Sequence, residues 1–216
     1  KLAIYDDASE TYDTKFLAKY TDLVLRFRVR GGVERSRARS FRDFEYIFKN
    51  YDLFYITDND TIHDPNFLKI LRDIYTLSSV SFEKKMPIGL FNSLFHSEPK
   101  NIISENEILS VRKTFPGVSQ CYDRSMVKNI VEFINNNPEY ETLYGFDYHW
   151  PASLGVPIIQ TKVSYLEHFA RDREEGGLHS KFSNNPMEDF DRDRALNPTS
   201  YLKKIRMKII EKIMSA

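Results

Sequence analysis

The stretch Asp52-Leu53-Phe54-Tyr55-Ile56-Thr57-Asp58-Asn59-Asp60 (residues 52–60) joins a short apolar run to three polar residues. An apolar run of this length, bounded by turn-forming residues, is typical of a buried β-strand. Side chains two apart at a strand end point to the same side, so Asp58 and Asp60 are expected to present their carboxylates together. Such a pair suits Mg²⁺ or Mn²⁺ and leaves positions for phosphate oxygens. The alternative is a plain polar turn.

A second apolar run, Leu2 to Tyr5, ends in the same way at Asp6-Asp7-Ala8-Ser9. In an α/β sheet, adjacent strand ends line one crevice. We therefore expect Asp6 and Asp7 to accept hydrogen bonds from a base N–H or a ribose hydroxyl of a nucleoside. An Asx turn or a helix cap is the alternative explanation.

Strands and helices alternate along the rest of the chain. Helical spacing of apolar residues predicts helices from the Ser36–Ser40 region to Tyr51, over 67–75 and after Asp123, with shorter ones in 14–20 and 144–154. Strands are expected at 23–29, 87–91, 111–114 and 118–122, with a strand pair in 158–166. This alternation predicts a Rossmann-type α/β sandwich whose central sheet is mostly parallel and flanked by helices.

Composition bounds the class of protein. The chain has 216 residues and equal numbers of Lys+Arg and Asp+Glu, 31 each, which argues against a general electrostatic grip on nucleic acid. Cys121 is the only cysteine, so no intrachain disulfide forms and a reducing, cytoplasmic setting is expected. No apolar run is long enough for a transmembrane helix. Because the chain opens on Lys1 and a strand, we expect it to start inside a larger gene product or after a removed tag.

Together, the two acidic motifs resemble those of GT-A glycosyltransferases. Ile4-Tyr5-Asp6-Asp7-Ala8-Ser9, followed by Tyr55-Ile56-Thr57-Asp58-Asn59-Asp60 after an Arg-containing helix start, is most similar to the large inverting family of bacterial and viral surface-polysaccharide transferases. The resemblance covers roughly residues 1–180. It implies that the first motif meets the nucleoside and that Asp58 and Asp60 hold Mn²⁺ or Mg²⁺ with the donor diphosphate.

One departure from the family concerns the N-terminal region. Such enzymes usually have a further strand and helix before the Asp6-Asp7 strand. Either the chain is partial or another segment completes the nucleotide pocket. We expect the transferase domain to cover residues 1–198, with or without that first unit.

An inverting transferase needs a carboxylate that takes the proton of the acceptor hydroxyl. The resemblance places this base in an acidic residue before an aromatic-rich helix, which here is Asp147 in the segment 144–150. A helix N-cap is the alternative role for Asp147. Tyr144, Tyr148 and Trp150 are expected either to stack on a sugar or to be core aromatics.

The resemblance also implies a late histidine that completes the metal shell. His168, in Leu166-Glu167-His168-Phe169, resembles that ligand, and neutral imidazole is acceptable to Mn²⁺. His179 is the rival. Its segment, Gly176 to Ser180, is expected to be a flexible loop that closes over the diphosphate and excludes water.

Three arginines, Arg35, Arg37 and Arg39, precede the predicted second helix. Arg–phosphate forks and a helix N-terminus suit a diphosphate, and Arg37 is the candidate for that contact. For at least two of the three, a solvated basic face is the favoured explanation.

The expected reaction is transfer of a sugar from a nucleoside-diphosphate sugar, with UDP as the expected nucleotide, to a hydroxyl of a glycan or lipid-linked glycan. A retaining transferase on the same fold is the first alternative. A nucleotidyltransferase would carry a Gly-rich basic loop after its first strand, which the sequence lacks, and a non-catalytic nucleotide-sugar or metal-binding module also stays open. Residues 171–197 are expected to form a long loop. The basic amphipathic helix predicted at 199–216 would contact an anionic membrane or a neighbouring domain.

Overall fold

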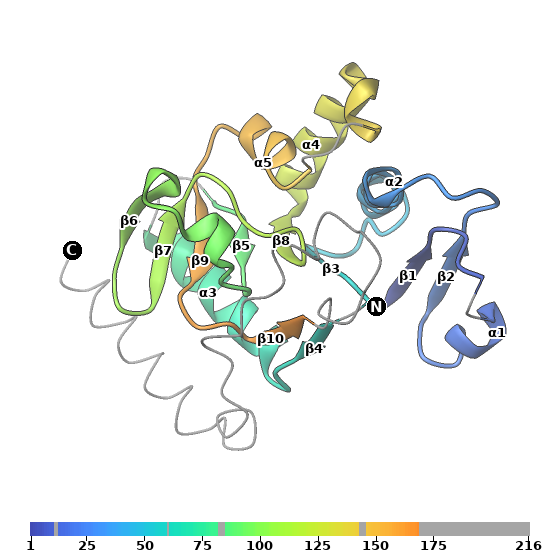
Figure 1. The fold of residues 1–216 in the computed structure, drawn as a ribbon, viewed down its shortest axis with the longest axis horizontal. Coiled ribbons are helices and arrows are strands. Elements are labelled where there is room, and N and C mark those ends of the chain that lie inside the picture. Colours follow the sequence, from blue (N-terminus) through green and yellow to red (C-terminus); the bar gives the residue numbers. More distant parts are fainter. Residues whose placement is uncertain (11–12, 60, 82–84, 143–145, 169–216) are drawn as a thin grey trace. The chain divides into compact units, whose positions relative to one another are not determined.

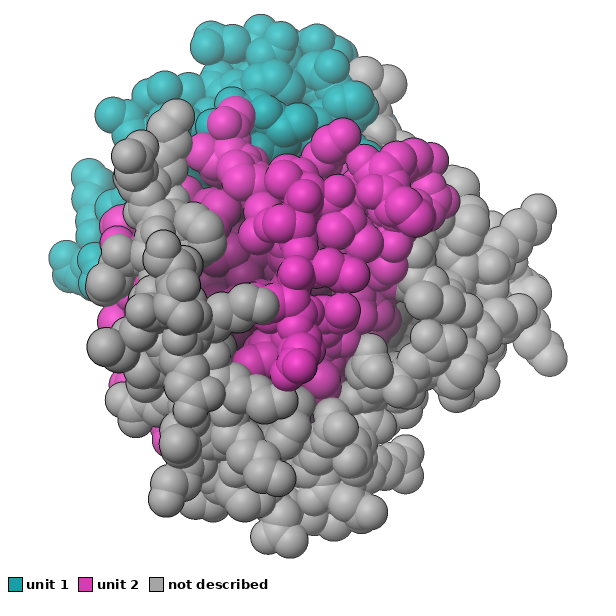
Figure 2. Space-filling model, turned by 90° about the vertical axis from the view of Figure 1, so that its left-hand side faces the viewer, with its two compact units in different colours: residues 1–52, 124–154 teal, residues 53–123, 155–216 magenta. Residues whose placement is uncertain are grey.

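The computed structural model describes residues 1–10, 13–59, 61–81, 85–142 and 146–168. The chain divides into two compact units, which Figure 2 colours separately. Unit 1 comprises residues 1–52 and 124–154, and unit 2 comprises residues 53–123 and 155–216. The predicted loop at 171–197, His179 within it, and the predicted helix at 199–216 lie outside the described residues.

Unit 1 combines a two-stranded parallel sheet with helices. Strand β1 pairs with β2 in a register that runs from Ala3 opposite Leu23 to Asp6 opposite Arg26. Helices α2 and α4 pack together around buried apolar side chains, including Phe41, Ile130 and Trp150. The elements are β1 (Ala3–Asp6), α1 (Thr14–Leu17), β2 (Leu23–Arg26), α2 (Val33–Tyr46), α4 (Arg124–Asn136), η3 (Pro138–Glu141) and α5 (His149–Ser153).

Helix α2 is placed differently from the sequence prediction. It begins at Val33, after Gly32 in the N-cap position with a φ of 89°, a conformation that glycine adopts without strain. It ends at Tyr46, so the apolar spacing that continues to Tyr51 extends beyond the helix. The three arginines at positions 35, 37 and 39 therefore lie inside the helix and do not precede it.

Unit 2 is built on a six-stranded sheet in the order β3-β8-β5-β9-β7-β6, with a separate pair formed by β4 and β10 (Figure 1). Helix α3 buries Ile70, Leu71 and Ile74 in one apolar cluster with Ile88 and Ile159 of the sheet. The elements are β3 (Leu53–Thr57), β4 (Thr61–His63), α3 (Phe67–Ser81), β5 (Ile88–Gly89), η1 (Leu94–Ser97), η2 (Pro99–Asn101), β6 (Ile102–Glu105), β7 (Leu109–Arg112), β8 (Ser119–Asp123), β9 (Ile158–Thr161) and β10 (Leu166–His168).

The mixed α/β class is confirmed, but the expectation of a mostly parallel sheet is wrong. In the described part of the six-stranded sheet, β5 and β9 are the one parallel neighbour pair, and the other four pairings are antiparallel. Two strands cause this: β8 runs opposite to both of its neighbours, β3 and β5, and β7 runs opposite to both of its neighbours, β9 and β6. The strands β9 and β10, predicted as a pair in 158–166, do not pair with each other, because they belong to different sheets.

Strand directions still bring four strand ends to one edge of this sheet. Strands β3 and β5 are each antiparallel to β8, and β9 is parallel to β5, so β3, β5 and β9 all run the same way. Strand β6 shares this direction, because it is antiparallel to β7, which is antiparallel to β9. The carboxyl ends of these strands therefore lie at the same edge. In α/β proteins this is the edge at which ligands bind.

Candidate functional site

Asp58 follows β3 at this carboxyl edge and is partly exposed. The hydroxyl of Thr61 donates to the carbonyl oxygen of Asp58 at 2.7 Å, and the hydroxyl of Thr57 donates to the carbonyl oxygen of Val118 at 2.8 Å. These bonds fix the main chain on both sides of Asp58. Asp60, the second acid of the motif, lies outside the described residues.

The pairing of β4 with β10 brings His168 near this turn. The two short strands are antiparallel, with His168 opposite Thr61 and Leu166 opposite His63. Directly opposite residues of an antiparallel pair have Cα atoms about 4.5–5.5 Å apart. The backbone of His168 therefore lies beside the residue that follows the Asp58-Asn59-Asp60 motif. His168 is the last residue of β10, and its side chain is outside the description.

A chain of hydrogen-bonded polar groups supports the same edge. The Tyr55 hydroxyl lies 2.9 Å from Nε2 of His63 and 3.1 Å from the Ser119 hydroxyl, which in turn accepts a hydrogen bond from the backbone N–H of Leu90. Burial raises the pKa of Tyr55 and lowers the pKa of His63. Both groups are thus held neutral, and the set links β3, β4 and β8 with the residue after β5. The sequence analysis missed this set, because groups from four separate segments form it.

In unit 1, protein groups engage both acids of the first motif. Oδ1 of Asp6 accepts from the backbone N–H of Ser9 at 2.9 Å, and Oδ2 lies 3.4 Å from Nε of Arg26. The two carboxylate oxygens of Asp7 accept from the backbone N–H groups of Gly31 and Gly32 at 2.7 and 2.8 Å. The turn-and-cap alternative is therefore present in the structure, and nucleoside contact stays a prediction.

The three arginines of α2 differ in burial. Arg37 is 4% exposed, and its guanidinium carbon lies 4.1 Å from the centre of the Phe146 ring. Arg35 and Arg39 are exposed, and Nε of Arg39 donates to Oδ1 of Asp43 at 2.8 Å. Of the three arginines, Arg37 is thus the buried one. It stacks on Phe146, the residue directly before Asp147.

Asp147, the predicted base, is 7% exposed and lies just before α5. Tyr148 is in the N-cap position of this helix, so Asp147 precedes the cap and does not occupy it. Trp150 is 1% exposed and packs edge-on against Phe41 and Phe146, as a core aromatic does. The structure thus describes Asp147 as a buried carboxyl beside an aromatic core, and its role as a base stays a prediction.

Of the three predicted metal ligands, Asp58 is the one whose side chain the structure describes. Two carboxylates and an imidazole are donor types that Mn²⁺ accepts, so the residue types of the prediction suit that ion. Among the described residues no group of three or more His, Cys, Asp or Glu side chains is arranged to hold a metal, but this excludes Asp60 and the side chain of His168. Across the same described ranges, no helix is long and apolar enough to cross a membrane.

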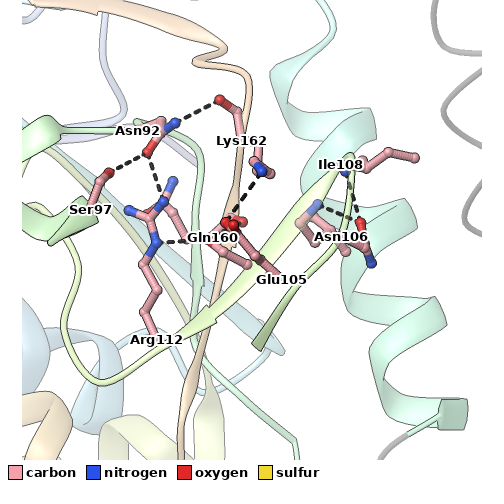
Figure 3. A network of polar contacts seen from close by, with 10 residues as sticks. Asn92, Ser97, Glu105, Asn106, Ile108, Arg112, Gln160 and Lys162 are labelled. Atoms are coloured by element: carbon pink, nitrogen blue, oxygen red, sulfur yellow. Dashed lines mark hydrogen bonds and ion pairs between the residues drawn. The ribbon is translucent and has the colours of Figure 1, made fainter. Parts of the chain in front are cut away.

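A second polar cluster of unit 2 is centred on Arg112, which is 2% exposed (Figure 3). Its Nε donates to the Ser110 hydroxyl at 2.6 Å, and its Nη2 donates to Oδ1 of Asn92 at 2.9 Å. Burial lowers the pKa of Arg112, with the charge of Glu105 opposing this shift. Asn92 directly follows the run Pro87–Phe91 that the sequence predicts as a strand, so the strand-end rule that selected Asp58 could also have selected Asn92.

Comparison of the chain with protein-family models and with curated proteins returns no match.

Proposed function

We propose that this protein is a metal-dependent glycosyltransferase that moves a sugar from a nucleoside-diphosphate sugar, UDP-linked in the first instance, to a hydroxyl of a glycan acceptor. The observation that carries the proposal is the β4–β10 register, in which His168 lies opposite Thr61 beside the acidic motif that begins at Asp58. Two sequence segments that the resemblance assigns to one metal are thus adjacent in the backbone of unit 2.

Each residue has a proposed role. Asp58, Asp60 and His168 would hold Mn²⁺ or Mg²⁺, which when bound supplies Lewis-acid stabilisation of the leaving diphosphate. Asp6 and Asp7 are assigned to the nucleoside through the strand end they occupy, and Arg37 to the donor phosphates. His179 is assigned to closure over the donor.

Asp147 is proposed to accept the proton of the acceptor hydroxyl as that oxygen forms its bond to the sugar carbon, with inversion. Its place directly before α5, in the aromatic segment that the resemblance assigns to the base, supports this role. The acceptor is a glycan or a lipid-linked glycan. The same proposal includes a cytoplasmic location and no nucleic-acid partner. Residues 199–216 would make peripheral contact with a membrane or contact a neighbouring domain.

Calorimetric titration tests the donor site. UDP is titrated into the protein with Mn²⁺ and then with EDTA, and the series is repeated with GDP and dTDP if UDP gives no heat. Binding is expected to require the metal and to be lost in Asp58→Ala. Asp52→Ala is the matched control, because it removes the exposed acid directly before β3, at the end opposite to Asp58. This variant should bind as the wild type does. Absence of nucleotide binding under all these conditions would refute the proposal.

The Asp147→Asn variant separates catalysis from binding. It keeps the shape of the side chain and removes the base, so transfer to an acceptor, or hydrolysis of the donor by water, should fall by roughly 10²–10⁴-fold. Nucleotide affinity should stay at the wild-type value. Retained turnover in this variant would remove Asp147 from the reaction.

A further inference from the structure

Asn92 connects two segments at the carboxyl edge of unit 2. Its Nδ2 donates to the carbonyl oxygen of Lys162 at 2.7 Å (Figure 3). Its backbone N–H donates to the Ser164 hydroxyl at 3.0 Å. One residue of the chain after β5 therefore holds two points of the connection between β9 and β10. The N–H of Tyr165 adds a third link, to the carbonyl oxygen of Leu90 at 2.9 Å.

The orientation of the Asn92 amide is set by Arg112. A guanidinium has donors and no acceptor, so the amide atom that faces it must be Oδ1. The Ser97 hydroxyl also donates to Oδ1, at 2.9 Å. With Oδ1 fixed by these donors, Nδ2 is directed to the carbonyl oxygen of Lys162.

Arg112 depends strongly on this contact. It is almost fully buried, and a buried cation is costly unless its N–H groups find acceptors. Among the described residues its hydrogen-bond acceptors are the neutral groups of Ser110 and Asn92, and its Nη1 has none. Loss of the Asn92 contact would leave this charge still less satisfied, which gives Asn92 a strong preference for one orientation.

The connection held by Asn92 leads directly into β10. The carbonyl oxygen of Tyr165 accepts from the N–H of Asp64 at 2.8 Å, and the pairing with β4 continues from Leu166 to His168. We propose that Asn92, oriented by Arg112, is a positioning residue that fixes the 162–165 connection and thereby the placement of His168 opposite Thr61. The metal-related half of this inference rests on the proposed function.

An isosteric variant, Asn92→Asp, tests the inference. It keeps an acceptor for Arg112 and Ser97 and supplies the carboxylate that Arg112 lacks, but it sets an oxygen against the carbonyl oxygen of Lys162. We expect faster amide hydrogen exchange at Asp64 and Tyr165, and Mn²⁺ affinity lower by about tenfold, the scale found when outer-shell partners of a metal ligand are changed. The urea midpoint of unit 2 should not fall, because Arg112 gains a charged partner.

Asn106→Asp is the matched control. Oδ1 of Asn106 accepts from the N–H groups of Ile108 and Leu109, and an aspartate accepts the same two bonds. This variant should match the wild type in exchange and in Mn²⁺ affinity. Ser164→Ala, which removes only the acceptor of the Asn92 N–H, should speed exchange at Tyr165 in the same direction as Asn92→Asp.

The outcomes separate the two proposals. Wild-type exchange rates at Asp64 and Tyr165 in both Asn92→Asp and Ser164→Ala would overturn the positioning role, whatever the metal does. Faster exchange with unchanged Mn²⁺ affinity would overturn the link to His168. If the wild-type protein itself binds no Mn²⁺, the proposed function fails, while the exchange data still decide whether Asn92 fixes the connection.

Discussion

Arg124 at the start of α4 is expected to contribute more to the stability of unit 1 than any ordinary surface charge. Its guanidinium donates to the carbonyl oxygen of Phe44 in the last turn of α2 and to those of Phe48 and Tyr51 in the segment that follows, at distances of 2.5–3.4 Å, and stacks 4.5 Å from the centre of the Phe44 ring. Carbonyls at a helix end have no partner within the helix, and a cation there also interacts favourably with the helix dipole. Arg124 thus joins the two helices.

The magnitude follows from these contacts. A hydrogen bond to a charged donor contributes about 1.5–3 kcal/mol when buried, but the Arg124 side chain is 30% exposed, so about 1 kcal/mol for each of the three carbonyls is appropriate. Arg124→Ala should therefore destabilise unit 1 by about 2–3 kcal/mol. Arg124→Lys keeps the charge but not the planar fork, so it should lose about half as much.

Urea denaturation followed by tryptophan fluorescence measures this effect, because Trp150 is the single tryptophan and lies buried in unit 1. With a slope of about 1–3 kcal/mol per molar urea, the midpoint should fall by roughly 1 M in Arg124→Ala. Lys128→Ala is the control on the same helix. Its exposed ion pair with Glu132, 3.9 Å long, is worth only about 0.3–0.5 kcal/mol. Equal midpoints for the two variants would refute the capping argument.

Four further predictions concern three residues. Burial raises the pKa of the Cys121 thiol to about 12, with the Asp123 charge adding to the shift. The native protein at pH 8 should therefore not react with a thiol reagent, whereas the urea-unfolded chain should bind one equivalent. Rapid labelling of the native protein would contradict this. Because the folded pKa is raised, the stability that the neutral thiol contributes is complete below pH 9 and declines as the pH rises towards 12, a decline that Cys121→Ser should lack in urea titrations. Gly89→Ala would place a Cβ too close to Oε1 of Gln160 and 3.0 Å from the Phe115 ring. The free energy of unfolding of unit 2 should therefore fall by about 1–3 kcal/mol, measured by circular-dichroism melts. An unchanged melt would show that the site has room for the methyl group. Asp7→Ala removes the acceptor of two N–H groups before α2 and should lower the Trp150 fluorescence midpoint by an amount equivalent to about 1–2 kcal/mol, whereas Asp13→Ala at the short helix α1 should change it little.

The positions of most elements could be predicted from the sequence, because apolar periodicity directly records which face of a segment is buried. The strand Leu53–Thr57, the helix from Phe67 and the helix after Asp123 all lie where their spacing predicts them. Strand direction could not be predicted in this way. A buried apolar run has the same appearance in either direction, so nothing in residues 119–123 signals that β8 runs antiparallel to both of its neighbours.

The candidate site was predictable only in part, for a related reason. Asp58 is a candidate because acids follow an apolar strand, and Asn92 satisfies the same rule. The pairing of Thr61 with His168 joins two three-residue strands far apart in the chain, and strands this short carry no periodic signal. The cap that Asp7 provides to Gly31 and Gly32 likewise depends on tertiary contact, which explains why α2 begins earlier than its apolar spacing indicates.

The central claim, a metal site at the carboxyl edge of unit 2, is tested most directly by paramagnetic broadening of backbone amide resonances. Mn²⁺ is added with UDP to isotope-labelled protein, and the amides of Thr61 and His168 are compared with that of Ile158. Ile158 lies at the amino end of β9, away from the carboxyl edge. The account predicts that Thr61 and His168 broaden first, that Ile158 stays sharp, and that Asp58→Ala abolishes the effect. Broadening centred elsewhere, or unchanged by Asp58→Ala, would contradict it.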